Sequence, residues 1–174
     1  MPDSASRSAW ERPWRERPGE QAALLNPAFV GETVARVVTG YRRSGERPLP
    51  LPLAFLVPPL VLPPAIRALL PKRANATFGT WTAINAPRLV DLPDRILRLR
   101  PVTREALLFL AQLGAVTLDG DGIVPGPRPL RLGVSPSKTT DETTHIRRAA
   151  DLVGRWFGAQ ADPAAIMQGL GTTP

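Results

Sequence analysis

The sequence predicts a mainly α-helical fold with a small β-hairpin and proline-rich irregular segments. Three observations support this. Apolar residues recur at helical spacing in several stretches, Asp-Gly pairs separate two short apolar runs, and 21 prolines and 14 glycines interrupt regular structure in the 174-residue chain. A chain of this length with 43% hydrophobic residues can bury one core. We therefore expect a flexible N-terminal tail rich in Trp and Arg, residues 1–18, followed by a single mostly helical domain, residues 19–174.

The first long helix is expected directly after Asn26. The Asn26 side chain can accept hydrogen bonds from free amides at a helix start, and Pro27 suits the first helical position. Gly45 indicates the end of this helix. The apolar residues at helical spacing form one stripe, as expected of an amphipathic core helix: Val30, Val34, Val37, Val38 and Tyr41.

The stretch from Pro48 to Pro71 contains eight prolines among residues that are mostly Leu, Val, Ala, Phe and Ile. Each proline fixes φ and removes a backbone donor, so this stretch cannot be one continuous helix or an interior strand. A short helix is expected from Pro64 to Leu70. Two interpretations stay open for the most apolar part, which forms either the floor of the core or a docking surface: Leu56, Val57, Leu60 and Val61.

Two short helices are expected in the middle of the chain. The first covers residues 75–84 and places Phe78 and Trp81 on one face, because they are three residues apart. The second covers residues 89–100, and Pro93 either starts it or kinks it.

A third helix is expected over residues 104–113, with Thr103 as its N-cap. Apolar residues cover nearly its whole surface, which is typical of a buried helix. Residues 115–118 and 123–124 are then expected to form a hairpin, because the Asp-Gly pairs between them favour a tight turn with positive φ.

This order of helix, tight break, buried helix and hairpin is that of a winged-helix-like module, expected over about residues 64–125. Such modules bind DNA or serve as protein-docking platforms. The helix before the hairpin is too apolar to enter a DNA groove. Three arginines on the preceding helix are candidates for contacts with phosphates: Arg95, Arg98 and Arg100.

A C-terminal helical segment is expected over residues 140–170. Thr139 and Glu142 have the spacing of a capping box, and Asp162-Pro163 starts a last short helix. The helix after Thr139 has one apolar face, which indicates core packing: Ile146, Ala149, Ala150, Val153, Trp156 and Phe157.

No residue pattern predicts catalysis or a cofactor. The chain has no cysteine, and its one histidine, His145, has no second His or Cys with which to share a metal. Asp119 and Asp121 are explained by turn chemistry, and no phosphate-binding glycine motif is present. We therefore expect no enzyme, no metal site and no small-molecule substrate. The N-terminus lacks the apolar region of a secretory signal, and prolines and Arg67 interrupt the one long apolar run, so no membrane span is expected.

The formal charge of +7 comes from 22 basic residues, of which only Lys72 and Lys138 are lysine. A GC-rich genome explains this arginine excess, and so does a surface that faces DNA or an acidic partner. Trp10 and Trp14 lie in a near-repeat and either fold back on the core or anchor a partner. The candidate partner-binding residues are Trp10, Trp14, Leu56, Val57, Leu60, Trp156 and Phe157.

Five sequence stretches resemble the middle component of bacterial three-component ABC systems, in matching order across residues 10–168. They are LLNPAF at 24–29, FLVPPLVL at 55–62, TREALLF at 103–109, VPGP at 124–127 and GRWF at 154–157. The resemblance implies a non-enzymatic subunit between a large ABC ATPase of the SMC or Rad50 type and an effector, often a nuclease, in defence against phage and plasmids. Its role is similar to that of the small accessory subunit of Lamassu systems.

Our leading hypothesis is an adaptor that docks on the ATPase and holds the effector until DNA engagement changes the ATPase. DNA would be contacted mainly through the ATPase, and the complex is expected in the cytoplasm. The alternative hypothesis is a free-standing winged-helix DNA-binding transcriptional regulator. A third is an enzyme whose site the residue patterns do not reveal.

Overall fold

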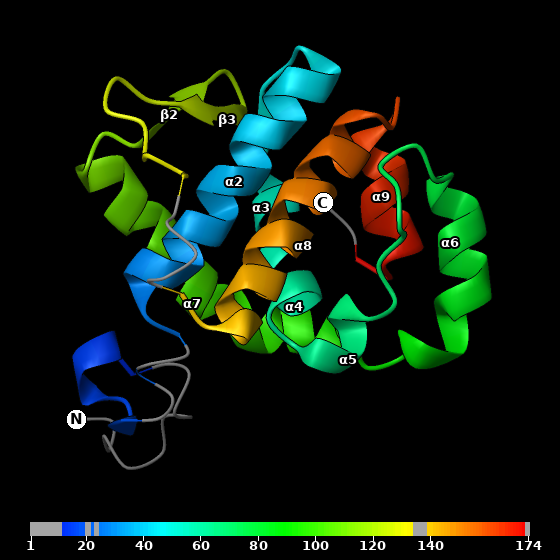
Figure 1. Ribbon diagram of the computed structural model, residues 1–174, viewed down its shortest axis with the longest axis horizontal. Helices are drawn as coiled ribbons and strands as arrows, with labels where there is room; N and C mark the ends of the chain where they lie inside the picture. The colour runs from blue at the N-terminus through cyan, green and yellow to red at the C-terminus, as the bar shows by residue number, and fades with distance from the viewer. Residues whose placement is uncertain (1–11, 20–21, 23–24, 134–138, 173–174) are drawn as a thin grey trace.

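The computed structural model describes residues 12–19, 22, 25–133 and 139–172 (Figure 1). The fold is mainly helical, as the sequence predicts, and it contains a small antiparallel sheet of three strands. Its elements in chain order are η2 (Trp14–Glu16), α2 (Pro27–Gly45), β1 (Leu49–Pro50), α3 (Leu51–Ala54), α4 (Val57–Val61), α5 (Pro64–Arg67), α6 (Phe78–Asn85), η3 (Ala86–Arg88), α7 (Leu92–Gln112), β2 (Val116–Asp119), β3 (Gly122–Pro125), α8 (Asp141–Gly158) and α9 (Pro163–Gly169).

Helix α2 is the predicted first helix, with the predicted start. The Asn26 Oδ1 atom accepts a hydrogen bond from the Ala28 amide at 2.8 Å, and Pro27 occupies the first turn. The helix ends at Gly45, after which Glu46 adopts a left-handed conformation with φ of 54°. Its predicted apolar stripe, from Val30 to Tyr41, is fully buried.

Helices α2 and α8 lie side by side at the centre of the molecule (Figure 1). They run parallel, because their contacts advance in step along both helices. Arg147 donates to Glu32 at 2.7 and 2.9 Å, and Arg36 contacts Asp151 at 3.2 Å one turn later. The apolar face predicted for the C-terminal helix is buried against this centre.

The start of α8 differs from the predicted capping box. Thr140 is the N-cap, and its hydroxyl accepts from the Thr143 amide at 3.2 Å. The Thr139 hydroxyl instead accepts from Arg147 at 2.9 Å, and Glu142 pairs with Arg67 at 2.5 Å. Thr139 and Thr140 each carry a hydroxyl that could cap the helix. The tertiary contacts of Thr139 and Glu142 leave Thr140 as the residue that does so.

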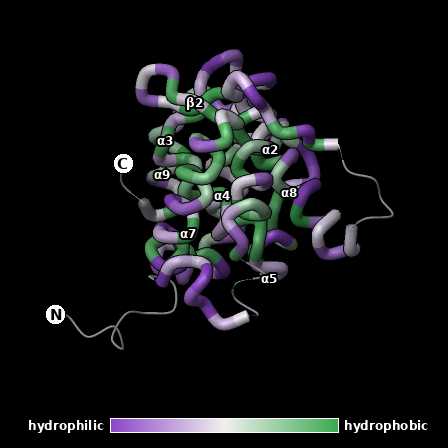
Figure 2. The backbone as a smooth tube through the Cα atoms, turned by 90° about the vertical axis from the view of Figure 1, so that its left-hand side faces the viewer, coloured by the Kyte–Doolittle hydropathy of each residue, from purple (hydrophilic) through white to green (hydrophobic). Residues whose placement is uncertain are grey.

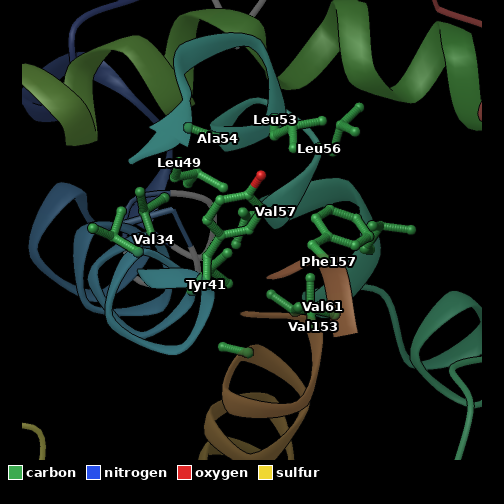
Figure 3. Packing of buried hydrophobic residues seen from close by; sticks show 14 of the residues in the cluster. Val34, Tyr41, Leu49, Leu53, Ala54, Leu56, Val57, Val61, Val153 and Phe157 are labelled. Carbon is green, nitrogen blue, oxygen red and sulfur yellow. The ribbon is translucent and has the colours of Figure 1, made fainter. Parts of the chain in front are cut away.

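The proline-rich stretch folds into β1 and the three short helices α3, α4 and α5. Prolines occupy the first turns of these helices, where no intrahelical donor is needed. The four apolar residues for which two interpretations were open belong to the core, with at most 1% of their surfaces exposed: Leu56, Val57, Leu60 and Val61. Tyr41 points from α2 towards Leu49 and Val57 (Figure 3).

Two predicted helices are in fact one 21-residue helix, α7. Pro93 lies in its first turn, and Pro101 lies inside it. Thr103 is therefore not an N-cap; it is fully buried, and its hydroxyl donates to the Leu99 carbonyl at 3.0 Å. Proline at position 101 removes one amide donor, yet the helix continues through it.

The expectation that the second half of α7 is buried on all sides is wrong. Ala106 and Leu110 face α2 closely, since a Cβ added at Gly31 would lie 3.2 Å from the Leu110 side chain. Leu108 on the other side of the helix has 55% of its surface exposed. The excess apolar surface of α7 thus remains accessible.

The predicted hairpin is present as β2 and β3, with a two-residue connection. Gly120 in this connection has φ of 62°, as the Asp-Gly pattern predicts. A third strand was missed: β1 pairs with β3, giving the order β1-β3-β2. Pro50 is tolerated because β1 is an edge strand. At Gly122 the two strands approach closely, since an added Cβ atom there would lie 2.5 Å from the Pro48 side chain.

The last elements close the core around an aromatic cluster. Phe78 and Trp81 pack on one another, as their spacing in the sequence predicts, with ring centroids 5.9 Å apart. The ring centroid of Trp156 lies 4.9 Å from that of Trp81. The Trp156 indole donates to the Ala76 carbonyl at 2.8 Å. Asp162 caps α9 as predicted. Within the described residues, no helix is long and apolar enough to cross a membrane.

Candidate functional site

Most of the sequence-predicted partner-binding residues lie in the core. Leu56, Val57, Leu60, Trp156 and Phe157 each have at most 1% of their surfaces exposed. No partner can reach these side chains while the chain is folded as described. Their apolar character reflects core packing.

Trp14 is half-buried and is held by its own chain, whereas Trp10 lies outside the described residues. The Trp14 indole donates to the Ala22 carbonyl at 2.6 Å, and its amide donates to Glu105 of α7 at 3.1 Å. Arg17 strengthens this attachment, because its guanidinium donates to the other carboxylate oxygen of Glu105 at 2.6 Å. Residues 14–17 are thereby fixed beside α7.

The three predicted phosphate-contacting arginines do not share one face of α7. Successive residues of a helix are about 100° apart, so Arg98 and Arg100 point about 160° away from each other. Arg95 is half-buried, and its Nε atom has no hydrogen-bond partner among the described residues. Of the three, Arg100 lines the groove described next.

A groove lies between α7, α3 and the β2–β3 hairpin, elements that share one side of the molecule in Figure 2. Its wider part has a volume of about 970 Å³. The Leu51 amide donates to the Asp121 carbonyl at 3.3 Å, which joins α3 to the hairpin turn and shapes one wall. Leu51, Leu108 and Leu118 in this part are 38%, 55% and 66% exposed.

The groove continues towards α9 as a second hollow of about 550 Å³. The two hollows share Leu51, Phe55 and Arg100. The second hollow adds Met167 of α9 and Leu97 of α7, which is 64% exposed. A continuous apolar surface therefore follows α7 along much of its length.

Arginines surround this apolar floor. The groove is lined by four arginines and one glutamate: Arg12, Arg17, Arg100, Arg104 and Glu105. Glu105 is already paired with Arg17. In the part of the chain that the structure describes, no carboxylate pairs with Arg100 or Arg104. The groove is thus apolar at its floor and positively charged at its rim.

The carboxylate with the clearest pKa shift lies away from the groove. Burial of Glu32 favours its neutral form, but hydrogen bonds from Arg147 and Arg36 outweigh this effect and hold the pKa of Glu32 below its usual value. Arg36 also donates to the Leu132 carbonyl. This network joins α2, α8 and residue 132, so its role is structural.

The described residues contain no group of three or more His, Cys, Asp or Glu side chains that could hold a metal ion. His145 is exposed on α8.

Sequence reasoning missed the exposed apolar residues of the groove. One feature could have found them: residues 104–113 contain more apolar positions than one helix face can present to a core. The prediction assigned that excess to burial on all sides. The structure shows that the excess faces solvent beside α3 and the hairpin.

A family model described as "ABC-three component (ABC-3C) system Middle Component 3" matches residues 14–174. The matched range includes every described residue that lines the groove except Arg12 and Pro13. No curated protein and no solved structure matches the chain.

Proposed function

Because the chain belongs to the Middle Component 3 family of ABC-three component systems, we propose that it is a non-catalytic adaptor that links the ABC ATPase of such a system to an effector. The ATPase would be of the SMC or Rad50 type, and the effector would be a nuclease. The complex would act in the cytoplasm against phage and plasmid DNA, in a role like that of the small Lamassu subunit. The ATPase would supply the nucleotide chemistry and most of the DNA contact.

The arginine-rimmed apolar groove is the observation that carries this proposal. Leu51, Leu97 and Leu118 are exposed around hollows that are mainly apolar, whereas the apolar residues of the core cluster are buried. Contiguous exposed apolar surface with a polar rim is typical of a protein interaction site. A subunit of a multi-component system needs such a surface.

Co-expression with the ABC ATPase and the effector of the same three-component system tests the proposal. A tag on this chain is expected to retain both proteins through purification in buffer of moderate salt. A chain that stays monomeric and retains neither protein would contradict the adaptor function.

A DNA-binding regulator is the second candidate, and one arrangement favours it. A long helix, α7, precedes a β-hairpin, as in the winged-helix arrangement that the sequence predicts, and Arg98 is exposed on that helix. A regulator would shift a DNA probe without other proteins, and its affinity would fall steeply with salt. An adaptor would show this behaviour only together with the ATPase.

A further inference from the structure

We propose that the groove binds a partner helix whose apolar stripe is flanked by Asp or Glu residues, the partner being the ATPase or the effector. This inference rests on the proposed function and adds the chemistry of the docked segment.

The lining residues of α7 have the spacing that a second helix requires. Five outward positions are separated by alternating steps of four and three residues: Leu97, Pro101, Arg104, Leu108 and Ala111. Such a 3.5-residue repeat keeps one seam of α7 facing a helix that packs alongside it. At a rise of 1.5 Å per residue the row is about 21 Å long, which fits about four helical turns of a partner.

The walls of the groove favour apolar side chains on the partner. Leu51 of α3 and Phe55, which directly follows α3, border both hollows, and Leu118 of β2 borders the wider one. A helix lying on the α7 row would cover the exposed surfaces of Leu97 and Leu108. Covering such apolar surface stabilises a complex by about 25 cal/mol per Å² of area removed from water, before the costs of association.

The rim requires acidic residues on the partner. Arg104 lies within the row, Arg100 lies beside it, and Arg12 lies at the wall formed by the N-terminal segment. The only carboxylate that lines the described groove, Glu105, is paired with Arg17. An Asp or Glu of the partner opposite Arg100 or Arg104 would gain a charge-assisted hydrogen bond.

The same charges argue against two other occupants. A second copy that docks through its own groove would place its Arg100 and Arg104 against the same arginines, and like charges disfavour that contact. DNA would satisfy the arginines but would leave the Leu97 and Leu108 surfaces uncovered. A helix with both apolar and acidic residues satisfies the floor and the rim together.

Affinity measurements on the full chain with the purified ATPase and, separately, the effector test this inference. For the protein that occupies the groove, Leu108→Asp and the double change Arg100→Glu with Arg104→Glu should each weaken binding by roughly tenfold or more. Ile84→Asp on α6 and Arg73→Glu are matched controls, because both residues are exposed and neither lines the groove. The controls should change affinity by less than about twofold.

A photo-cross-linking residue at position 108 then identifies the docked segment. The expected product is a cross-link to an amphipathic, acidic helix of one partner. A cross-link to a basic or uncharged segment, to DNA or to a second copy would overturn the inference. So would a complex that tolerates both groove variants, although the proposed adaptor function would then stand. If the unaltered chain binds neither protein, the adaptor function fails and this inference fails with it.

Discussion

A Cβ atom added at Gly154 of α8 would lie 2.7 Å from the carbonyl oxygen of Val37 of α2. The two central helices therefore meet where there is no room for a side chain. Gly158 repeats this relationship one turn later, since its added Cβ would lie 2.6 Å from the Tyr41 carbonyl. The GRWF stretch of the sequence begins at Gly154, so one of its residues has a packing role that only the structure shows.

Gly154→Ala should lower the free energy of unfolding by about 1–3 kcal/mol, because the added methyl group must displace backbone. Thermal unfolding followed by circular dichroism measures this change. Gly79→Ala in α6 is the matched control, since nothing lies within 4 Å of an added Cβ there. It should leave stability unchanged or raise it by up to about 1 kcal/mol. Equal effects of the two changes would show that close helix packing does not depend on Gly154.

Glu32→Gln should weaken the fold at neutral pH by roughly 1–3 kcal/mol, because Glu32 accepts charge-assisted bonds from Arg147 and Arg36. The pKa of Glu32 is lowered in the folded chain, so its stabilising contribution is present above its usual pKa of 4.5. That contribution is lost as the pH falls below 4.5 through the folded pKa.

Denaturant unfolding between pH 7 and pH 3 measures this dependence. The difference in stability between the unaltered chain and Glu32→Gln should shrink as the pH falls through that window. Glu142→Gln is the control, because Glu142 is half-exposed in its pair with Arg67 and should contribute less than about 1 kcal/mol. A difference that stays constant down to pH 3 would contradict the assigned role of Glu32.

Glu105→Gln should loosen residues 14–17, because the change removes the charge that holds Arg17. Trypsin is then expected to cut after Arg15 several-fold faster, since cleavage follows local opening; the Arg17–Pro18 bond is not a trypsin site. Mass spectrometry of the fragments measures the rate. Glu46→Gln removes an exposed charge that has no ion pair among the described residues and should leave the rate unchanged. An unaltered rate in Glu105→Gln would mean that other contacts hold this segment.

Changing Trp10 and Trp14 to Ala separates the two roles considered for them. Trp14→Ala removes the hydrogen bond to the Ala22 carbonyl and should lower the free energy of unfolding by about 1–2 kcal/mol. We predict that Trp10→Ala weakens complex formation with the ATPase or effector without changing helicity. Calorimetry and pull-down assays read out the two effects. Loss of stability with Trp10→Ala, and no loss of binding, would assign Trp10 to the chain's own core.

Local patterns predicted much of the fold because the interactions concerned are local. Asn26 caps α2, Gly120 takes the positive φ of the turn, and Phe78 packs on Trp81, all within a few residues. Predictions failed where distant contacts decide the outcome. Thr103 and Thr139 each resemble an N-cap locally, yet one is buried inside α7 and the other binds Arg147.

The position of the candidate groove was missed for the same reason, although the excess of apolar residues in 104–113 is visible in the sequence. Apolar residues in α7 looked like core residues, and only the packing of α2 against Leu110 shows which of them remain outside. Strand β1 is two residues long and forms only because residue 49 meets Ile123 across the sheet. That pairing positions Leu51, which directly follows β1, at the groove. Local sequence patterns do not show which residues far apart in the chain come into contact in this way.

The central claim is that this chain connects an ATPase to an effector, and light scattering after size-exclusion chromatography tests it most directly. The purified ATPase and effector would be mixed with and without this chain, and the mass of each eluted species would be measured. We predict a complex containing all three proteins when the chain is present, and separate ATPase and effector when it is absent. An ATPase–effector complex that forms equally well without the chain would contradict the account.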